Sequence, residues 1–125
     1  MTRKVLIIDD DNQVRETLQL HLENDDFQVV TAADGAQGIQ VAEAENPSVI
    51  VLDLAMPDID GLEVLDRLRK DAITWDTPII ICTAEGDSKS RDQSHRLGIS
   101  RFLRKPVSPR RIISEINRLL QEIGT

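Results

Sequence analysis

Charged and polar side chains follow four of the apolar runs in the sequence. Asp9 and Asp10 come directly after KVLII, Asp53 follows VIVL, Thr83 follows PIIIC and Lys105 follows RFLR. Clustered carboxylates repel one another unless a cation joins them, and hard oxygen ligands suit Mg²⁺. An ammonium and a hydroxyl opposite such a cation can hold a phosphoryl group, and a carboxylate beside it can act as the nucleophile.

These five side chains can meet only if the runs before them are neighbouring parallel strands. Five short segments are predicted to be strands: residues 4–8, 28–31, 49–52, 79–82 and 101–104. Most of them are rich in Val, Ile and Leu, which is typical of strands covered on both faces. The pattern therefore predicts a parallel sheet flanked by helices.

Helical patterns alternate with these strands. Apolar residues at helical spacing indicate helices beginning near Asn12, Ala36, Leu62 and Pro109, and the polar segment 87–97 has the length of one more. Five strand–helix repeats with right-handed crossovers predict a doubly wound (βα)5 α/β fold, a three-layer sandwich around a five-stranded parallel sheet. Ligands in such sheets bind beyond the carboxyl ends of the strands, where the five polar side chains are predicted to lie.

The composition limits the classes of function. The 125 residues predict a single domain over 1–125, with a core of Ile, Leu and Val because aromatic residues make up only 2%. The net charge of −7 and the few aromatic residues count against direct binding of nucleic acid or an anionic membrane. The single cysteine, Cys82, fits a reducing compartment, and no segment approaches the length of a membrane span. A cytoplasmic location is expected.

Taken together, the motifs resemble the receiver domain of bacterial two-component response regulators, which occurs alone in chemotaxis regulators. The matching segments are VLIIDDDNQVRETL, AADG, VIVLDLAMPDIDGLEVL, PIIICTAE and FLRKPVS, in the family's order and spacing. They cover essentially the whole chain, and their combination is highly specific. The resemblance implies a flavodoxin-like (CheY-like) fold with strand order 2-1-3-4-5, one receiver domain, and a signalling role in a phosphorelay.

The resemblance also implies roles for individual residues. Asp53 is expected to accept a phosphoryl group from a sensor histidine kinase or a histidine phosphotransfer protein. Mg²⁺ is expected to bind Asp10 and Asp53 directly, Asp9 through water, and the backbone carbonyl of Ala55. Lys105 corresponds to the family's phosphoryl-binding lysine. The chain is thus expected to catalyse only its own phosphorylation and dephosphorylation.

Thr83 and Phe102 are expected to form the switch that transmits phosphorylation. In the family, the hydroxyl moves toward the phosphoryl group, and the space that it leaves admits the aromatic side chain from an outward rotamer. Phe102 lacks the hydroxyl of the tyrosine often found there, so one switch hydrogen bond is lost. The Lys105–Pro106 bond is expected to be cis, and the small Ala84 is expected to leave an access path to the site.

The last helix and its neighbours are the predicted partner surface. Its core face is assigned to Ile112, Ile116, Leu119 and Ile123. Ile113 and Leu120 are assigned to its flank, and the arginines nearby are Arg101, Arg104, Arg110, Arg111 and Arg118. Apolar residues rimmed by arginine suit a protein interface, so this face is predicted to mediate homodimerisation or to bind a downstream effector or output domain. A wide core stripe with solvated arginines explains the same residues about equally well.

Other features have simpler interpretations. The segment 87–97 has almost no apolar stripe, so its helix is expected to be weakly anchored. Trp75 is predicted to cover the amino end of the sheet. Asp58 and Asp60 are assigned to the turn that leads into the third helix.

Three other classes of protein share part of this pattern. A Mg²⁺-dependent phosphatase of the haloacid dehalogenase type has an Asp-x-Asp pattern after its first strand, which Asp9 and Asp11 match superficially. Gln13 stands where a threonine would be expected, and no second acidic pair follows a late strand. A pseudo-receiver that takes no phosphate is disfavoured because the five site residues are present. A dinucleotide-binding domain is disfavoured because aspartates, and not a glycine-rich turn, follow the first strand.

Overall fold

The computed structural model describes residues 3–124, and in that part of the chain five strands alternate with five helices. Their order is β1 (Lys4–Ile8), α1 (Asn12–Asn24), β2 (Gln28–Ala32), α2 (Gly35–Glu45), β3 (Val49–Leu52), α3 (Gly61–Lys70), β4 (Ile79–Thr83), α4 (Ser88–Arg96), β5 (Arg101–Arg104) and α5 (Pro109–Glu122). All the predicted elements are present, with β2 and β4 each one residue longer than predicted. None of the helices in residues 3–124 is long and apolar enough to cross a membrane.

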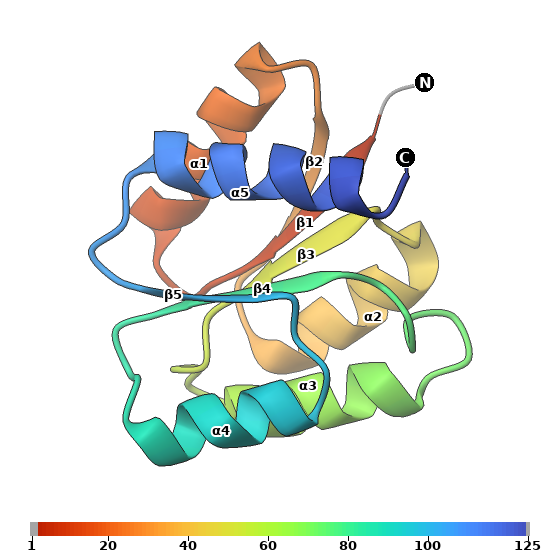
Figure 1. The fold of residues 1–125 in the computed structure, drawn as a ribbon, viewed down its shortest axis with the longest axis vertical. Helices are drawn as coiled ribbons and strands as arrows, with labels where there is room; N and C mark the ends of the chain where they lie inside the picture. Colours follow the sequence, from red (N-terminus) through yellow and green to blue (C-terminus); the bar gives the residue numbers. More distant parts are fainter. Residues whose placement is uncertain (1–2, 125) are drawn as a thin grey trace.

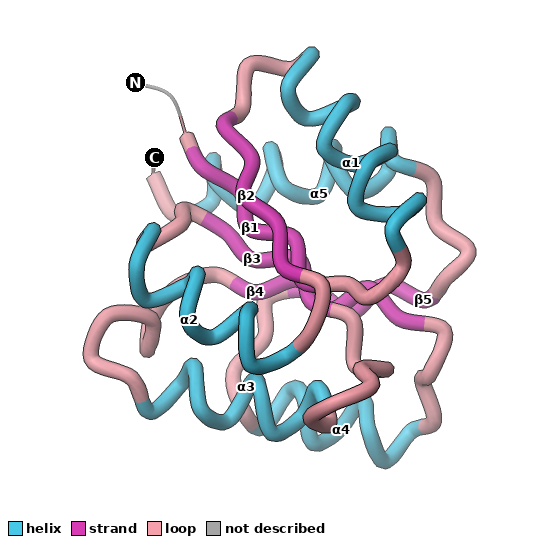
Figure 2. The backbone as a smooth tube through the Cα atoms, turned by 180° about the vertical axis from the view of Figure 1, so that it is seen from behind, coloured by secondary structure: helices cyan, strands magenta, loops and turns pink. Residues whose placement is uncertain are grey.

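The five strands form one parallel sheet in the order β2-β1-β3-β4-β5, which confirms the predicted fold class and strand order. Helices α1 and α5 cover one face of the sheet, and α2, α3 and α4 cover the other (Figure 1). The view from behind in Figure 2 shows the same three layers. Because the order of the strands reverses at β1, the carboxyl ends of β1 and β3 lie side by side at the switch point.

Side chains of the inner strands alternate between the two faces of the sheet. In β1, Val5 and Ile7 belong to the core between the sheet and helices α1 and α5. Leu6 and Ile8 belong to the core between the sheet and helices α2 and α3. All four are fully buried. This alternation is the period of two expected for a strand covered on both faces. It holds the ends of the inner strands, and hence the polar residues that follow them, in fixed positions.

Polar residues at the strand–helix junctions begin the helices. Asp11 caps α1, Asp60 caps α3 and Ser108 caps α5, each by accepting hydrogen bonds from amides of the first turn. Pro109 occupies the start of α5, where its missing N–H costs nothing. The peptide bond between Lys105 and Pro106 is cis, as was predicted from the sequence.

The predicted faces of α5 need two corrections. Leu120 is fully buried in the core, and Ile113 is half-buried against it. Ile123, which was assigned to the core face, is 48% exposed because α5 ends at Glu122. Helix α5 packs against α1 as well as against the sheet (Figure 1), so its buried stripe is wider than one face of the sheet alone would require. The flank of α5 is therefore less apolar than the sequence indicated.

An arginine, and not Trp75, organises the loop before β4. Trp75 is 60% exposed, so the prediction that it covers the sheet was wrong. Arg69 of α3 donates hydrogen bonds at 2.8–3.2 Å to five backbone carbonyls, those of Thr74, Trp75, Thr77, Leu97 and Gly98. Its guanidinium therefore joins the loop before β4 to the turn before β5.

Candidate functional site

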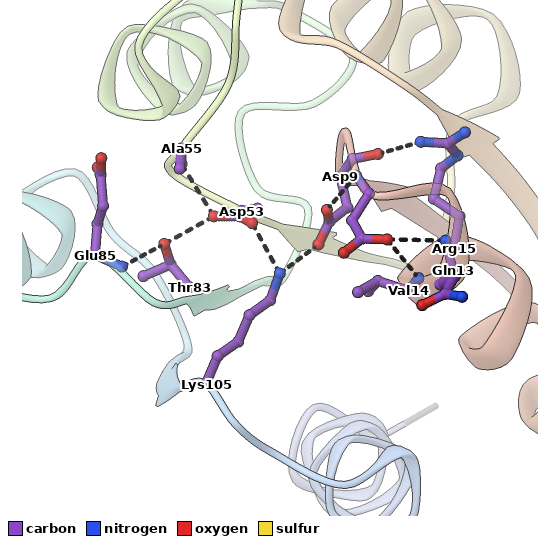
Figure 3. A network of polar contacts seen from close by, with 10 residues as sticks. Asp9, Gln13, Val14, Arg15, Asp53, Ala55, Thr83, Glu85 and Lys105 are labelled. Carbon is purple, nitrogen blue, oxygen red and sulfur yellow. Dashed lines mark hydrogen bonds and ion pairs between the residues drawn. The ribbon is translucent and has the colours of Figure 1, made fainter.

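Asp53, just after the central strand β3, is the hub of a polar cluster (Figure 3). Its carboxylate accepts hydrogen bonds from the amide of Ala55 at 2.9 Å, the hydroxyl of Thr83 at 2.7 Å and the ammonium of Lys105 at 2.9 Å. Asp53 is only 6% exposed. The structure thus brings residues from the ends of β3, β4 and β5 to one carboxylate. The predicted binding of a metal ion by the backbone carbonyl of Ala55 stays a prediction.

The end of β1 adds two more carboxylates. Asp9 is buried, and its carboxylate accepts hydrogen bonds from the amide of Asp11 at 2.9 Å and from Lys105 at 2.8 Å. Asp10 is exposed. One carboxylate oxygen from each of Asp9, Asp10 and Asp53 lies within 4.8 Å of the other two. Three hard oxygen donors at this spacing, one of them open to solvent, fit a small divalent cation such as Mg²⁺.

Lys105 lies between two of the carboxylates and sets the electrostatics of the cluster. Burial alone would lower the pKa of Lys105, but its hydrogen bonds to Asp53 and Asp9 outweigh burial and raise the pKa, so the ammonium is charged at neutral pH. Burial raises the pKa of Asp9, and the hydrogen bonds from Lys105 and the amide of Asp11 offset this only in part. Three carboxylates against one ammonium leave an excess of negative charge that a bound cation would relieve.

Thr83 links the site to the loop before α4. Its hydroxyl is fully buried, donates to Asp53 and accepts a hydrogen bond from the amide of Glu85 at 3.1 Å.

The next residue, Ala84, is exposed and lines a cleft of about 480 Å³ between α1 and the start of α5. Cys82 lies on the wall of this cleft. Burial raises the pKa of Cys82 to about 11, so its thiol is not a nucleophile at neutral pH.

Phe102, the predicted switch residue, lies on β5 and is half-buried against the core over α2 and α3. The guanidinium of Arg91 from α4 lies 5.6 Å from the centre of its ring, close enough for a cation–π interaction. Within α4 only Ser94 is buried, as the polar sequence of this helix predicted. The contact between Arg91 and Phe102 therefore matters more for the position of α4 than it would for a well-buried helix.

Sequence reasoning missed two residues that hold the site in place. Arg15 of α1 donates a hydrogen bond to the carbonyl of Asp9 at 2.7 Å. Asp58, which was assigned to a turn, accepts hydrogen bonds from the amides of Gly35 and Ala36 at 2.9 and 3.0 Å. It thereby ties the loop after β3 to the beginning of α2. No local pattern reveals this contact, because its partners are more than 20 residues away in the chain.

Comparison with known proteins adds independent information. A family model described as the response regulator receiver domain matches residues 5–117. The chain is 34% identical over 121 residues to the alkaline phosphatase synthesis transcriptional regulatory protein PhoP of Bacillus subtilis, covering 97% of this chain and 50% of PhoP. It is 33% identical over 121 residues to the transcriptional regulatory protein SrrA of Staphylococcus aureus, covering 97% and 49%. The chain spans about half the length of these curated relatives.

Solved structures share the fold. A CheY-like receiver domain protein from Methanospirillum hungatei superposes with a TM-score of 0.93 at 26% identity, over 98% of this chain and 96% of that one. The chemotaxis protein CheY4 of Vibrio cholerae superposes with a TM-score of 0.88 at 28% identity, over 94% and 98%. These matches favour the receiver interpretation over the phosphatase and dinucleotide-binding alternatives.

Proposed function

The chain belongs to the response regulator receiver domain family, and on that basis we propose that it is the phosphoacceptor of a two-component phosphorelay. In this proposal residues 1–125 are a single receiver domain that works in the cytoplasm and takes a phosphoryl group onto Asp53. One observation supports it above all. Asp53 is a buried carboxylate that receives hydrogen bonds from both Lys105 and Thr83 and lies beside two further aspartates.

The chemistry assigned to Asp53 is a nucleophilic displacement at phosphorus. A carboxylate oxygen of Asp53 forms a bond to phosphorus while the phosphorus–nitrogen bond of a donor phosphohistidine breaks, and the released imidazole takes up a proton from water. Lys105, which already contacts Asp53, balances negative charge on the phosphoryl oxygens during the transfer. Asp9 holds the Lys105 ammonium in place from the other side.

The acidic cluster is assigned to a Mg²⁺ ion. Asp10 and Asp53 would hold it directly, Asp9 through water, and the backbone carbonyl of Ala55 would complete the protein ligands. The spacing of the three carboxylates and their excess negative charge support this assignment. When bound, the ion would supply positive charge to the phosphoryl oxygens of the transition state.

The signal is proposed to leave the site through Thr83 and Phe102. Once a phosphoryl group occupies Asp53, the Thr83 hydroxyl can donate to a phosphoryl oxygen in place of the carboxylate. Thr83 also accepts a hydrogen bond from the amide of Glu85, so its movement displaces the start of the loop that leads to α4. Arg91 of α4 contacts Phe102 of β5, and the shape of the surface made by α4, β5 and α5 changes with both.

The partners follow from this scheme. A sensor histidine kinase or a histidine phosphotransfer protein supplies the phosphoryl group, and a downstream effector or an output domain responds to the changed surface. The two relatives described above are named transcriptional regulatory proteins and are about twice as long as this chain, which favours an output domain in those proteins. Homodimerisation through α4, β5 and α5 is a second way to use the same surface.

Intact mass spectrometry tests the proposal. The protein is incubated with a small-molecule phosphodonor, with and without Mg²⁺, as wild type, Asp53→Asn and the control Asp66→Asn on the exposed side of α3. We expect a Mg²⁺-dependent gain of one phosphoryl group in the wild type and the control, and none in Asp53→Asn. A gain that persists in Asp53→Asn, or no gain in the wild type under any condition, would overturn the proposal.

A further inference from the structure

The turn between β1 and α1 carries two of the three carboxylates of the acidic cluster, and only one of the two is held directly. The carboxylate of Asp9 accepts hydrogen bonds from the amide of Asp11 and from Lys105. Asp10 is exposed, and within the described part of the chain no amide or side chain donates a hydrogen bond to its carboxylate. The position of the Asp10 carboxylate therefore depends on the backbone of the turn.

Arg15 of α1 fixes this backbone. Its guanidinium donates a hydrogen bond at 2.7 Å to the carbonyl of Asp9, which lies in one rigid peptide plane with the nitrogen of Asp10. Figure 3 shows the side chain of Arg15 directed at this carbonyl. On the other side, the amide of Asp9 donates at 3.2 Å to the carbonyl of Ala32 at the end of β2. Both peptide groups that flank Asp9 are thus bound, and the direction in which the chain leads to Asp10 is set.

The guanidinium of Arg15 is itself held by two neighbours on α1. A second N–H of Arg15 donates at 2.8 Å to the side-chain oxygen of Asn12. The side-chain NH₂ of Asn12 donates in turn at 3.1 Å to the carboxylate of Glu16, so its oxygen is left to face Arg15. Three side chains within five residues therefore hold one guanidinium against one backbone carbonyl.

Electrostatic repulsion gives this arrangement a task. One oxygen from each of Asp9, Asp10 and Asp53 lies within 4.8 Å of the other two, a separation at which like charges repel. Lys105 offsets the charge of Asp9 and Asp53 by direct contact, and Asp10 is left to the backbone of the turn. If that backbone could reorient, the exposed Asp10 would move away into solvent. The three oxygens would then no longer have the spacing that one small cation can bridge.

We propose that Arg15 is a positioning residue of the cation site: by binding the Asp9 carbonyl it keeps Asp10 beside Asp9 and Asp53 and so strengthens the binding of Mg²⁺. Its hydrogen bonds go to the backbone and to Asn12, so it is not assigned as a ligand. This inference rests on the Mg²⁺ ion assigned to the acidic cluster in the proposed function.

The proposal predicts an effect opposite in sign to that of charge. A guanidinium near a cation site repels the cation, so removing Arg15 would tighten the binding of Mg²⁺ if its charge were all that mattered. Removing a group that holds a metal ligand in place instead weakens binding, by about 10- to 100-fold in known metal sites. The direction of the change therefore separates the two effects.

Titration with Mg²⁺, followed by the NMR chemical shifts of backbone amides, measures this direction. Arg15→Met should raise the dissociation constant for Mg²⁺ by about tenfold, although a positive charge is removed. Asn12→Ala keeps every charge and should raise it by about threefold, because Arg15 loses one acceptor. The double variant should bind no more weakly than Arg15→Met alone, since Asn12 acts through Arg15. The matched control Arg67→Met removes the same charge from an exposed position of α3 and should stay within about twofold of the wild type.

Two further readouts separate positioning from chemistry and from folding. Initial rates of mass gain with a small-molecule phosphodonor are measured over a range of Mg²⁺ concentrations. In Arg15→Met the Mg²⁺ concentration that gives half of the maximal rate should rise by about tenfold, while the maximal rate stays within about threefold of the wild type. In the metal-free protein, the heteronuclear NOE of the Asp10 amide should fall in Arg15→Met, because the peptide group is no longer held.

The outcomes distinguish this inference from the proposed function. Mg²⁺ binding that is unchanged or tighter in Arg15→Met, additive losses in the double variant, or an unchanged NOE of Asp10 would each overturn the positioning role and leave the proposed function intact. A lower maximal rate at an unchanged half-saturating concentration would also overturn it, because Arg15 would then act in the transfer itself. A wild-type protein that binds no Mg²⁺ would overturn the metal assignment, and the role of Arg15 with it.

Discussion

At the scale of single residues, the site combines one ammonium with three carboxylates. Lys105 contacts Asp9 and Asp53 at once, so the same side chain stabilises the empty site and is placed to meet the incoming phosphoryl group. The two carboxylates also explain why its charge is strongly held, since each of them raises the pKa of Lys105. Variants that remove the charge of Lys105, or keep the charge but change its position, can therefore show which of the two matters for the chemistry.

Replacing Lys105 by Met should slow phosphorylation by a small phosphodonor by about 10- to 100-fold, because no ammonium then balances the phosphoryl oxygens. Lys105→Arg keeps the charge but changes the geometry, and should recover part of the rate. The initial rate of mass gain measures this. The control Lys70→Met, on the exposed side of α3, should match the wild type. Equal rates in Lys105→Met and the wild type would exclude the assigned role.

Most residues of the site can be predicted from the sequence because the fold makes them neighbours. Asp9, Asp53 and Thr83 each follow an apolar run, and the carboxyl ends of parallel strands meet at one edge of the sheet. Arg15 and Asp58 could not be found in this way. They act through backbone groups of other segments, and a side chain that serves a distant amide or carbonyl leaves no local pattern.

At the scale of elements, the loop between β3 and α3 has to pass very close to the beginning of α3. The amide of Gly61 donates a hydrogen bond to the carbonyl of Leu54 at 3.0 Å. A Cβ atom on Gly61 would lie 2.3 Å from the Cα of Leu54, much closer than backbone atoms tolerate. The loop that follows Asp53 is thus closed by a contact that only glycine permits.

Gly61→Ala should lower the free energy of unfolding by about 2–4 kcal/mol, since the backbone must shift to admit the methyl group. Urea denaturation followed by circular dichroism measures the change. Gly86→Ala is the matched control because its new Cβ would meet only the flexible end of Arg104, at 2.9 Å. Equal stabilities of the two variants would show that the loop adapts without cost.

A second connection between elements depends on Arg69, which binds five carbonyls of two loops. Arg69→Met should lower the free energy of unfolding by about 2–3 kcal/mol, because hydrogen bonds from a charged group are lost and water replaces them only in part. Arg67→Met on the same helix loses one exposed ion pair and should change it by less than about 0.5 kcal/mol. Chemical denaturation of both variants decides, and similar losses would refute the special role of Arg69.

The order of the elements could be predicted because short continuous apolar runs, which indicate buried strands, alternate with longer segments, most of which have apolar residues at helical spacing. The faces of α5 could not be predicted fully, since Leu120 is buried and Ile123 exposed. The width of a buried stripe depends on how many neighbours a helix has, and α5 contacts α1 as well as the sheet. The position of Trp75 could not be predicted either, because the loop that contains it is held by hydrogen bonds from Arg69, which lies on another element.

At the scale of the whole molecule, ion pairs around Glu115 couple stability to pH. Burial alone would raise the pKa of Glu115, but hydrogen bonds from Arg111 and Arg101 and the charge of Arg118 outweigh it and lower the pKa. A carboxyl whose pKa is lower in the folded state stabilises that state above its ordinary pKa of 4.5. The contribution is lost as the pH falls through the lowered folded-state pKa.

Glu115→Gln should therefore cost about 1–2 kcal/mol of unfolding free energy at neutral pH, and the difference from the wild type should shrink as the pH falls below 4.5. Denaturant titrations over a series of pH values measure this. Glu63→Gln, which removes one exposed ion pair, should show a small difference at every pH. A difference for Glu115→Gln that does not change with pH would mean that packing, and not charge, makes Glu115 important.

The central claim is that a phosphoryl group becomes attached to Asp53, and chemical trapping tests it most directly. Borohydride reduces an aspartyl-phosphate to homoserine, and peptide mass mapping then identifies which residue was modified. After treatment with a phosphodonor and Mg²⁺, we predict conversion at residue 53 alone. Conversion at Asp9 or Asp10 would instead favour a nucleophile after β1, as in the phosphatase alternative, and no conversion at any aspartate would contradict the phosphoacceptor account.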